Sequence, residues 1–177
     1  MRSVIVYESM FGNTREIADA IASALAEAGE VVVVPVSHAT PEVLDGIDLL
    51  VVGGPTHAHS MSSAQTRKGA PQYVEKSDGD LHLEPDYEGP GLRDWFQKLQ
   101  VAPVSAAAFD TRVDISAVLS GRASKGIASR LRKHGCRLVA EPESFLVDKS
   151  NHLLPDEAER ARVWGAVLAA STRPSLA

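Results

Sequence analysis

VIVYESMFGNTREIADAIA, residues 4–22, begins as a short apolar run and continues as a helix-patterned segment. Residues 3–7 are mostly β-branched and are followed by polar residues, which is typical of a strand. From residue 14 onward an apolar stripe recurs at helical spacing, and the segment ends at Gly29, a common helix terminator. The stretch therefore predicts a strand, a tight turn and a helix in direct succession. The stripe consists of Ile17, Ala18, Ile21, Ala22 and Leu25.

The same succession repeats along the chain. Further strands are predicted by the short apolar runs at 31–36, 48–54, 104–109 and 137–147, and helices by 91–100, 124–135 and 155–170, whereas 37–47 leaves room for only a short helix. The first four strands hardly alternate between apolar and polar residues, as expected of parallel strands buried on both faces. The pattern predicts an α/β fold, a three-layer sandwich of a five-stranded parallel sheet with helices on both faces.

Composition limits the class of protein. A chain of 177 residues with 44% hydrophobic and 23% charged residues predicts one globular domain over 1–177. The net charge of -5 gives no general attraction to nucleic acid. The start lacks a secretory signal pattern and no stretch reaches the ~18 apolar residues of a membrane span, so we expect a cytoplasmic protein without one.

Cysteine and metal chemistry have little support in the sequence. Cys136 is the one cysteine, so an internal disulfide is excluded, and we expect a small buried side chain rather than a redox thiol. No histidine pair or carboxylate pair occurs at metal-ligand spacing, and no catalytic nucleophile motif is present. We therefore expect no bound metal and no catalytic side chain.

The turn between the first strand and the first helix has an unusual density of small residues with donor groups, at 9–14. Backbone N–H groups at a helix start lack intrahelical partners, so an oxyanion such as phosphate finds converging donors there. Helix capping alone also favours such residues, so the turn by itself leaves both interpretations open. It contains neither a P-loop lysine nor a G-x-G-x-x-G dinucleotide fingerprint.

Residues 60–91, called the excursion below, are rich in Gly, Pro, Ser and Asp and have little periodicity. Long loops of this kind in compact domains are typically functional or mobile. For Arg67 within it, and for Arg122 and Lys125 near the start of a later helix, the default expectation is a side chain that reaches into water.

VIVYESMFGNTREIADAIA, together with DLLVVGGPTHAHS after the third strand, resembles the flavodoxin family. The resemblance follows the strand order of the whole chain but is specific in those two loops and only weakly so in AAAFDTR. It implies strand order 2-1-3-4-5, with FMN bound at the carboxyl ends of the strands. The residues implied for the phosphate are Ser9, Met10, Phe11, Gly12, Asn13 and Thr14; for the ribityl chain and one side of the ring, Pro55, Thr56, His57 and Ala58; and for the other side, Phe109, Asp110, Thr111 and Arg112.

Flavodoxins that act as low-potential carriers usually hold the flavin ring between aromatic side chains and surround it with acids. Here His57 stands at the expected Trp position, and His57, His59 and Arg112 replace acids. Cations near the ring favour the reduced anion, so we expect a higher flavin potential.

The resemblance predicts an FMN protein that passes electrons between a reductase and an acceptor, as a monomer or homodimer. Two alternatives stay open. One is a flavin-dependent oxidoreductase acting on a small substrate, such as a quinone reductase or a protoporphyrinogen-oxidase-like enzyme, with the excursion shaping its pocket. The other is a cofactor-free binding module.

Overall fold

The structure is a computed structural model that describes residues 1–57, 59–77 and 79–172. Its strands are β1 (Arg2–Tyr7), β2 (Glu30–Pro35), β3 (Leu49–His57), β4 (Ser60–Met61), β5 (Ser105–Val113), β6 (Arg137–Leu138) and β7 (Glu143–Val147). Its α-helices are α1 (Asn13–Leu25), α2 (Ala64–Lys68), α3 (Ala70–Glu75), α4 (Leu92–Lys98), α5 (Ala117–Ser120), α6 (Ala123–Lys133) and α7 (Glu157–Thr172), and two 3₁₀ turns are η1 (Ala26–Ala28) and η2 (Val36–His38).

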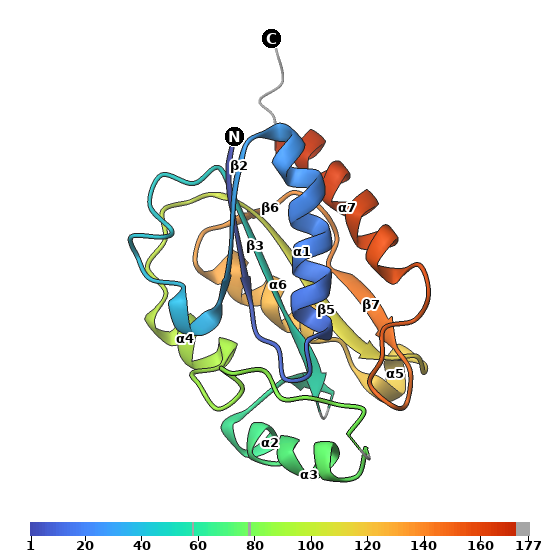
Figure 1. The fold of residues 1–177 in the computed structure, drawn as a ribbon. Helices are drawn as coiled ribbons and strands as arrows, with labels where there is room; N and C mark the ends of the chain where they lie inside the picture. The colour runs from blue at the N-terminus through green and yellow to red at the C-terminus, as the bar shows by residue number, and fades with distance from the viewer. Residues whose placement is uncertain (58, 78, 173–177) are drawn as a thin grey trace.

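The central sheet is parallel in the order β2-β1-β3-β5-β6, with β7 also paired to β5 (Figure 1). The predicted fold class is confirmed, and the strand order differs from the prediction only in detail. The run at 137–147, predicted as one strand, forms two strands, β6 and β7. Ala106 of β5 pairs with Leu138 of β6, whereas Phe109 of β5 pairs with Glu143 of β7. The break includes Pro142, which has no N–H for the ladder. The short β4 adds an antiparallel partner to β3.

Two apolar layers hold helices on the two faces of the sheet. In β1, Val4 and Val6 face the layer that contains α4 and α6, whereas Ile5 and Tyr7 face α1 and α7. Successive residues of a strand point to opposite faces, so one non-alternating run supplies both layers. Trp95 packs in the layer with α4 and α6 and is mostly buried, as expected of a core aromatic.

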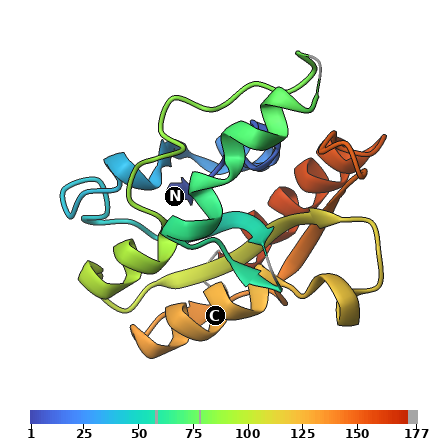
Figure 2. The same cartoon turned by 90° about the horizontal axis from the view of Figure 1, so that it is seen from below.

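The excursion contains more regular structure than its sequence pattern indicates. It forms β4, α2 and α3, and in the view from below it lies across the lower end of the sheet (Figure 2). These helices, and α5 later in the chain, are too short to show a helical period in sequence, so the prediction missed them. Segment 37–47 holds only the end of η2 and turns.

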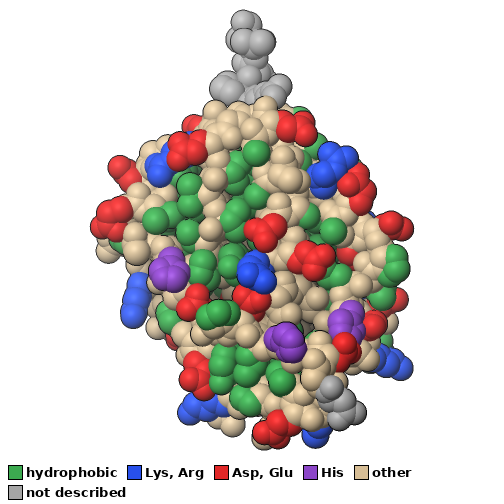
Figure 3. Space-filling model, viewed as in Figure 1, with side chains coloured by type: hydrophobic (Ala, Val, Ile, Leu, Met, Phe, Trp, Pro, Cys, Tyr) green, Lys and Arg blue, Asp and Glu red, His purple; other side chains and the backbone are tan. Residues whose placement is uncertain are grey.

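Other expectations from composition can be compared with the structure. Cys136 is buried, and burial raises the pKa of its thiol, as expected of a packing residue. Among the described residues, no helix has the length and apolar character needed to span a bilayer. No cluster of metal-ligating side chains occurs in that part of the chain. Acidic and basic side chains are interspersed on the face that Figure 3 shows.

Candidate functional site

The turn from β1 into α1 depends on the backbone conformation of Gly12. Its φ is 94°, in the left-handed region that side chains with a Cβ rarely adopt. The N–H of Gly12 donates to Oγ of Ser9 at 3.1 Å, and α1 begins at the next residue. The turn is therefore fixed by its own sequence, with the N-terminus of α1 at the carboxyl end of the sheet.

The side chains that follow Gly12 fasten this turn to its surroundings. Nδ2 of Asn13 donates to the carbonyl of Asn151 at 2.7 Å, and the buried hydroxyls of Thr14 and Thr111 are 2.8 Å apart. The sequence suggested that Asn13 and Thr14 hold a ligand directly, whereas here both side chains have protein partners. The first N–H groups of α1, which have no intrahelical acceptor, are the donors best suited to an anion.

A pocket of about 220 Å³ joins this turn to the ends of β3 and β5. It brings together residues that are far apart in the sequence, as expected for the carboxyl edge of a parallel sheet. The predicted residues that line it are Ser9, Met10, Phe11, Asn13, Thr14, Pro55, Thr56, His57, Thr111 and Arg112. Gly12, Phe109 and Asp110 do not line it, and Ala58 lies outside the described residues.

Phe109 belongs to the core rather than to the pocket wall. It is fully buried on the α1 and α7 side of the sheet, with its ring centroid 6.1 Å from that of Phe145 and 6.4 Å from that of Trp164. Its ring occupies the space that a Cβ on Gly53 would need. The non-alternating run 104–109 gave no indication of which face Phe109 would take.

Asp110 does not line the pocket but binds Thr56, which does. It is fully buried, and its Oδ2 accepts the hydroxyl of Thr56 at 3.1 Å and the N–H of Ser124 at 2.7 Å. Oγ of Thr56 in turn accepts the N–H of Ala123 at 2.8 Å. These contacts cap the N-terminus of α6, whose own N-cap residue, Arg122, makes no capping bond. Arg122 instead donates to Oγ of Ser144 and to the carbonyl of Pro142, so it does not simply reach into water.

The two predicted basic residues that line the pocket differ in electrostatic character. Burial lowers the pKa of His57, so its imidazole is held neutral near pH 7. The guanidinium of Arg112 donates to the carbonyl of Ile115 at 2.7 Å, while its buried Nε has no partner among the described residues. Arg112 therefore brings a permanent positive charge and a donor to the pocket wall. His59 is exposed and does not line the pocket.

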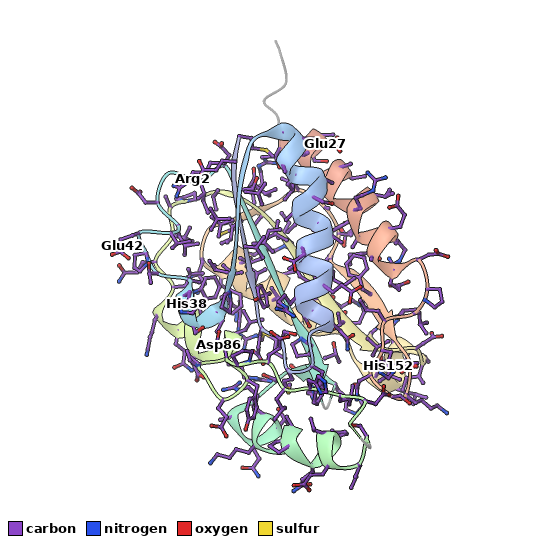
Figure 4. The ribbon with its side chains drawn as sticks, in the orientation of Figure 1. Arg2, Glu27, His38, Glu42, Asp86 and His152 are labelled. Carbon is purple, nitrogen blue, oxygen red and sulfur yellow. The ribbon has the colours of Figure 1, made fainter. Side chains whose placement is uncertain are left out.

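Sequence reasoning missed several lining residues, namely Tyr73, Val113, Val147, Lys149 and Asn151. Val113 and Val147 end β5 and β7, and Lys149 and Asn151 follow β7, so all four lie at the same carboxyl edge. Only the carboxyl-edge rule could have pointed to them. Tyr73 comes from α3, and no sequence signal placed it here. Nε2 of His152, a residue labelled in Figure 4, lies 3.2 Å from Oδ2 of Asp80. This contact links the excursion to the segment after β7.

The donors, the glycine turn and the unpartnered Nε of Arg112 fit a ligand with an anionic end and a polar ring system. A flavin mononucleotide has this chemistry: a phosphate, a hydroxylated chain and a ring with acceptor atoms. The pocket's wall residues have the donor types that such a group requires.

Comparison with known proteins finds a family match for part of the chain and a similar fold for nearly all of it. Residues 4–83 match the flavodoxin domain model, while a comparison with curated protein sequences finds no match. Similar solved structures include flavodoxin 1 from Bacillus cereus in its oxidised form, with 20% identity, a TM-score of 0.66, and coverage of 96% of this chain and 98% of that one.

A flavodoxin from the domain Archaea has 18% identity and a TM-score of 0.64 over 97% of this chain and 99% of its own. A WrbA-like flavodoxin from Agrobacterium tumefaciens has 16% identity and a TM-score of 0.62 over 97% of each chain. At such identities these structures establish the fold, and the domain match adds the sequence evidence for the first strands and their loops. Residues 4–83 thus resemble the flavodoxin domain, and the chain as a whole has the flavodoxin fold.

Proposed function

We propose that this protein binds FMN and passes electrons through it between a reductase and an acceptor, in the cytoplasm. The observation that carries the proposal is that one pocket joins the N-terminus of α1 to the carboxyl ends of β3 and β5. An anion site at a helix start, next to walls from two neighbouring strands, suits a ligand with a phosphate at one end and a planar ring at the other.

In this proposal the chain's residues bind and orient the cofactor. The turn at 9–14 holds the phosphate with backbone N–H groups, and Gly12 keeps that turn in its required conformation. Pro55, Thr56 and His57 flank the chain and one side of the ring, and Thr111 and Arg112 flank the other. When bound, the flavin supplies one- and two-electron chemistry, so no catalytic side chain is needed.

Charge in the pocket favours a higher potential than that of acid-lined carriers. The guanidinium of Arg112 brings a positive charge that would stabilise a reduced, anionic ring, whereas neutral His57 adds a donor without a charge. A redox titration of the FMN-loaded protein is expected to give a semiquinone/hydroquinone couple above that of an acid-lined flavodoxin. An equal or lower couple would refute this part of the proposal.

Flavin binding tests the proposal first. We expect the purified protein to show the absorbance of a bound flavin, or to quench the fluorescence of added FMN at micromolar concentrations. Reduction of the bound flavin by a ferredoxin- or flavodoxin-type reductase, followed by reoxidation by a protein acceptor, would support electron transfer. Failure to bind FMN would refute it and leave the cofactor-free module as the remaining function.

One observation favours a second candidate, a flavin-dependent oxidoreductase for a small substrate such as a quinone. The excursion contributes Tyr73 to the pocket, so the site has a wall beyond the flavin loops. Saturable reduction of a quinone by the FMN-loaded protein with a nicotinamide donor, at a rate above that of free FMN, would favour this candidate. If the FMN-loaded protein and free FMN reduced the quinone at equal rates, the electron carrier would be favoured.

A further inference from the structure

The excursion is tied at both of its ends to one carboxylate next to the phosphate turn. Glu8 directly follows β1 and is 7% exposed. Its Oε1 accepts the hydroxyl of Ser62, near the start of the excursion, and its Oε2 accepts the N–H of Leu92 at 2.8 Å, just beyond the end. Glu8 therefore holds the excursion closed at its base, one residue before Ser9.

Arg67 in α2 completes this buried cluster. It is 5% exposed, and its guanidinium lies 3.8 Å from Oε1 of Glu8 and 3.5 Å from Oδ2 of Asp94. Nη1 also donates to Oγ of Ser62 at 3.1 Å. Desolvation largely offsets the attraction of a buried ion pair, so such a pair often adds little net stability. The guanidinium of Arg67 nevertheless fixes the position of α2 relative to Glu8, because the Ser62 hydroxyl accepts from Arg67 and donates to Glu8.

The position of α3 follows from that of α2. Only Gly69 separates the two helices, and Ala70 at the start of α3 is buried. Tyr73 extends from α3 to the pocket, where its ring centroid lies 6.2 Å from that of Phe11 in an edge-to-face arrangement. Because Tyr73 is 54% exposed, its own burial does little to fix it there. Its place depends on the helix that carries it.

We propose that the Glu8–Arg67 pair positions Tyr73 as an aromatic contact of the bound flavin ring, so that the excursion supplies a Phe, Tyr or Trp contact that residues 55–57 and 111–112 lack. Arg67 and Glu8 are positioning residues, which act through α2 and α3, and Tyr73 is the residue that touches the ring. This inference rests on the proposed binding of FMN.

The test measures the affinity for FMN and the fluorescence of fully bound FMN in the full-length protein. A phenol ring in contact with a flavin quenches its emission, and an aromatic contact of about 0.5–1.5 kcal/mol changes an affinity by roughly two- to tenfold. We expect Tyr73→Leu to increase the fluorescence of the bound FMN and to raise its Kd by that factor. Arg67→Met should do the same, and the double variant should resemble either single variant, because both act on one contact.

Two further variants separate positioning from a general loss of structure. Lys68→Met removes a neighbouring, exposed cation of α2 and should leave both readouts unchanged. Glu8→Gln combined with Arg67→Met removes both buried charges, which avoids an unpaired one, and should still increase the fluorescence of bound FMN. Arg67→Lys keeps the charge and should restore part of the quenching.

The outcomes separate this inference from the proposed function. If the wild type binds no FMN, both fail. If it binds FMN and Tyr73→Leu leaves fluorescence and affinity unchanged, only the ring contact of Tyr73 is refuted, and the inference falls while the proposed function stands. If Tyr73→Leu has its effect but every Arg67 variant retains wild-type quenching, the positioning role of the pair is refuted.

Discussion

Asp110 should contribute more to stability than any surface carboxylate, because it is fully buried and caps a helix from a neighbouring strand. Asp110→Ala removes the acceptor for the N–H of Ser124 and for the hydroxyl of Thr56. Each hydrogen bond to a charged group is worth about 1.5–3 kcal/mol, and one of the donors left behind, the N–H of Ser124, is buried. Release of a buried carboxylate offsets part of that loss.

We expect the free energy of unfolding to fall by about 3–5 kcal/mol, a large part of the ~5–15 kcal/mol of a typical domain. With a urea dependence of roughly 2 kcal/mol per molar, the midpoint of unfolding should fall by about 2 M, as followed by far-ultraviolet circular dichroism. Asp110→Asn should lower the free energy of unfolding by less, since the amide oxygen of the new side chain can still accept the N–H of Ser124.

Ser124→Ala is the matched control for this prediction. It keeps the N–H that bonds to Asp110 and removes a buried hydroxyl that has no partner among the described residues. It should change the free energy of unfolding by less than about 1 kcal/mol. If Asp110→Ala were as stable as this control, the assignment of Asp110 as the trans cap of α6 would be refuted.

Two other substitutions test the packing and the charge of the site. Gly53→Ala should destabilise the fold by roughly 1–3 kcal/mol or more in urea unfolding, because its Cβ would lie 2.0 Å from the ring of Phe109; wild-type stability would contradict the packing described for Phe109. Burial lowers the pKa of His57 below its usual 6.5, so the unfolded chain takes up that proton first as the pH falls. The wild type should therefore lose more stability between pH 7.5 and 5.5 than His57→Gln, and equal losses would contradict the lowered pKa.

The sequence pattern was sufficient for the parts of the fold that are specified locally. The apolar run, the glycine turn and the helical stripe of residues 3–29 each carry their own signal, and the structure forms β1 and α1 there. Of the residues that the resemblance implied, 9–11, 13–14, 55–57 and 111–112 line one pocket, as the carboxyl-edge rule leads one to expect. The prediction of the fold needed only periodicity and the direction of parallel strands, whereas the candidate site residues came from the resemblance to flavodoxins.

Features that depend on distant partners could not be predicted in this way. Arg67 was expected to reach water, but Glu8 and Asp94 from other parts of the chain allow it to be buried. Arg122 likewise finds acceptors in the break before β7. Tyr73 reaches the pocket only because α2 and α3 fold back across the sheet edge. In each case the deciding contact lies far away in sequence, where local patterns carry no information.

The central claim is that the turn at 9–14 binds the phosphate of a flavin mononucleotide, and comparison of FMN with riboflavin tests it most directly. The two ligands differ only in that phosphate. Because each hydrogen bond to a charged group is worth about 1.5–3 kcal/mol, two or more should make FMN bind roughly 100-fold or more tightly. Equilibrium titrations by flavin fluorescence measure both affinities. A riboflavin affinity equal to that of FMN, or no binding of either, would contradict the account.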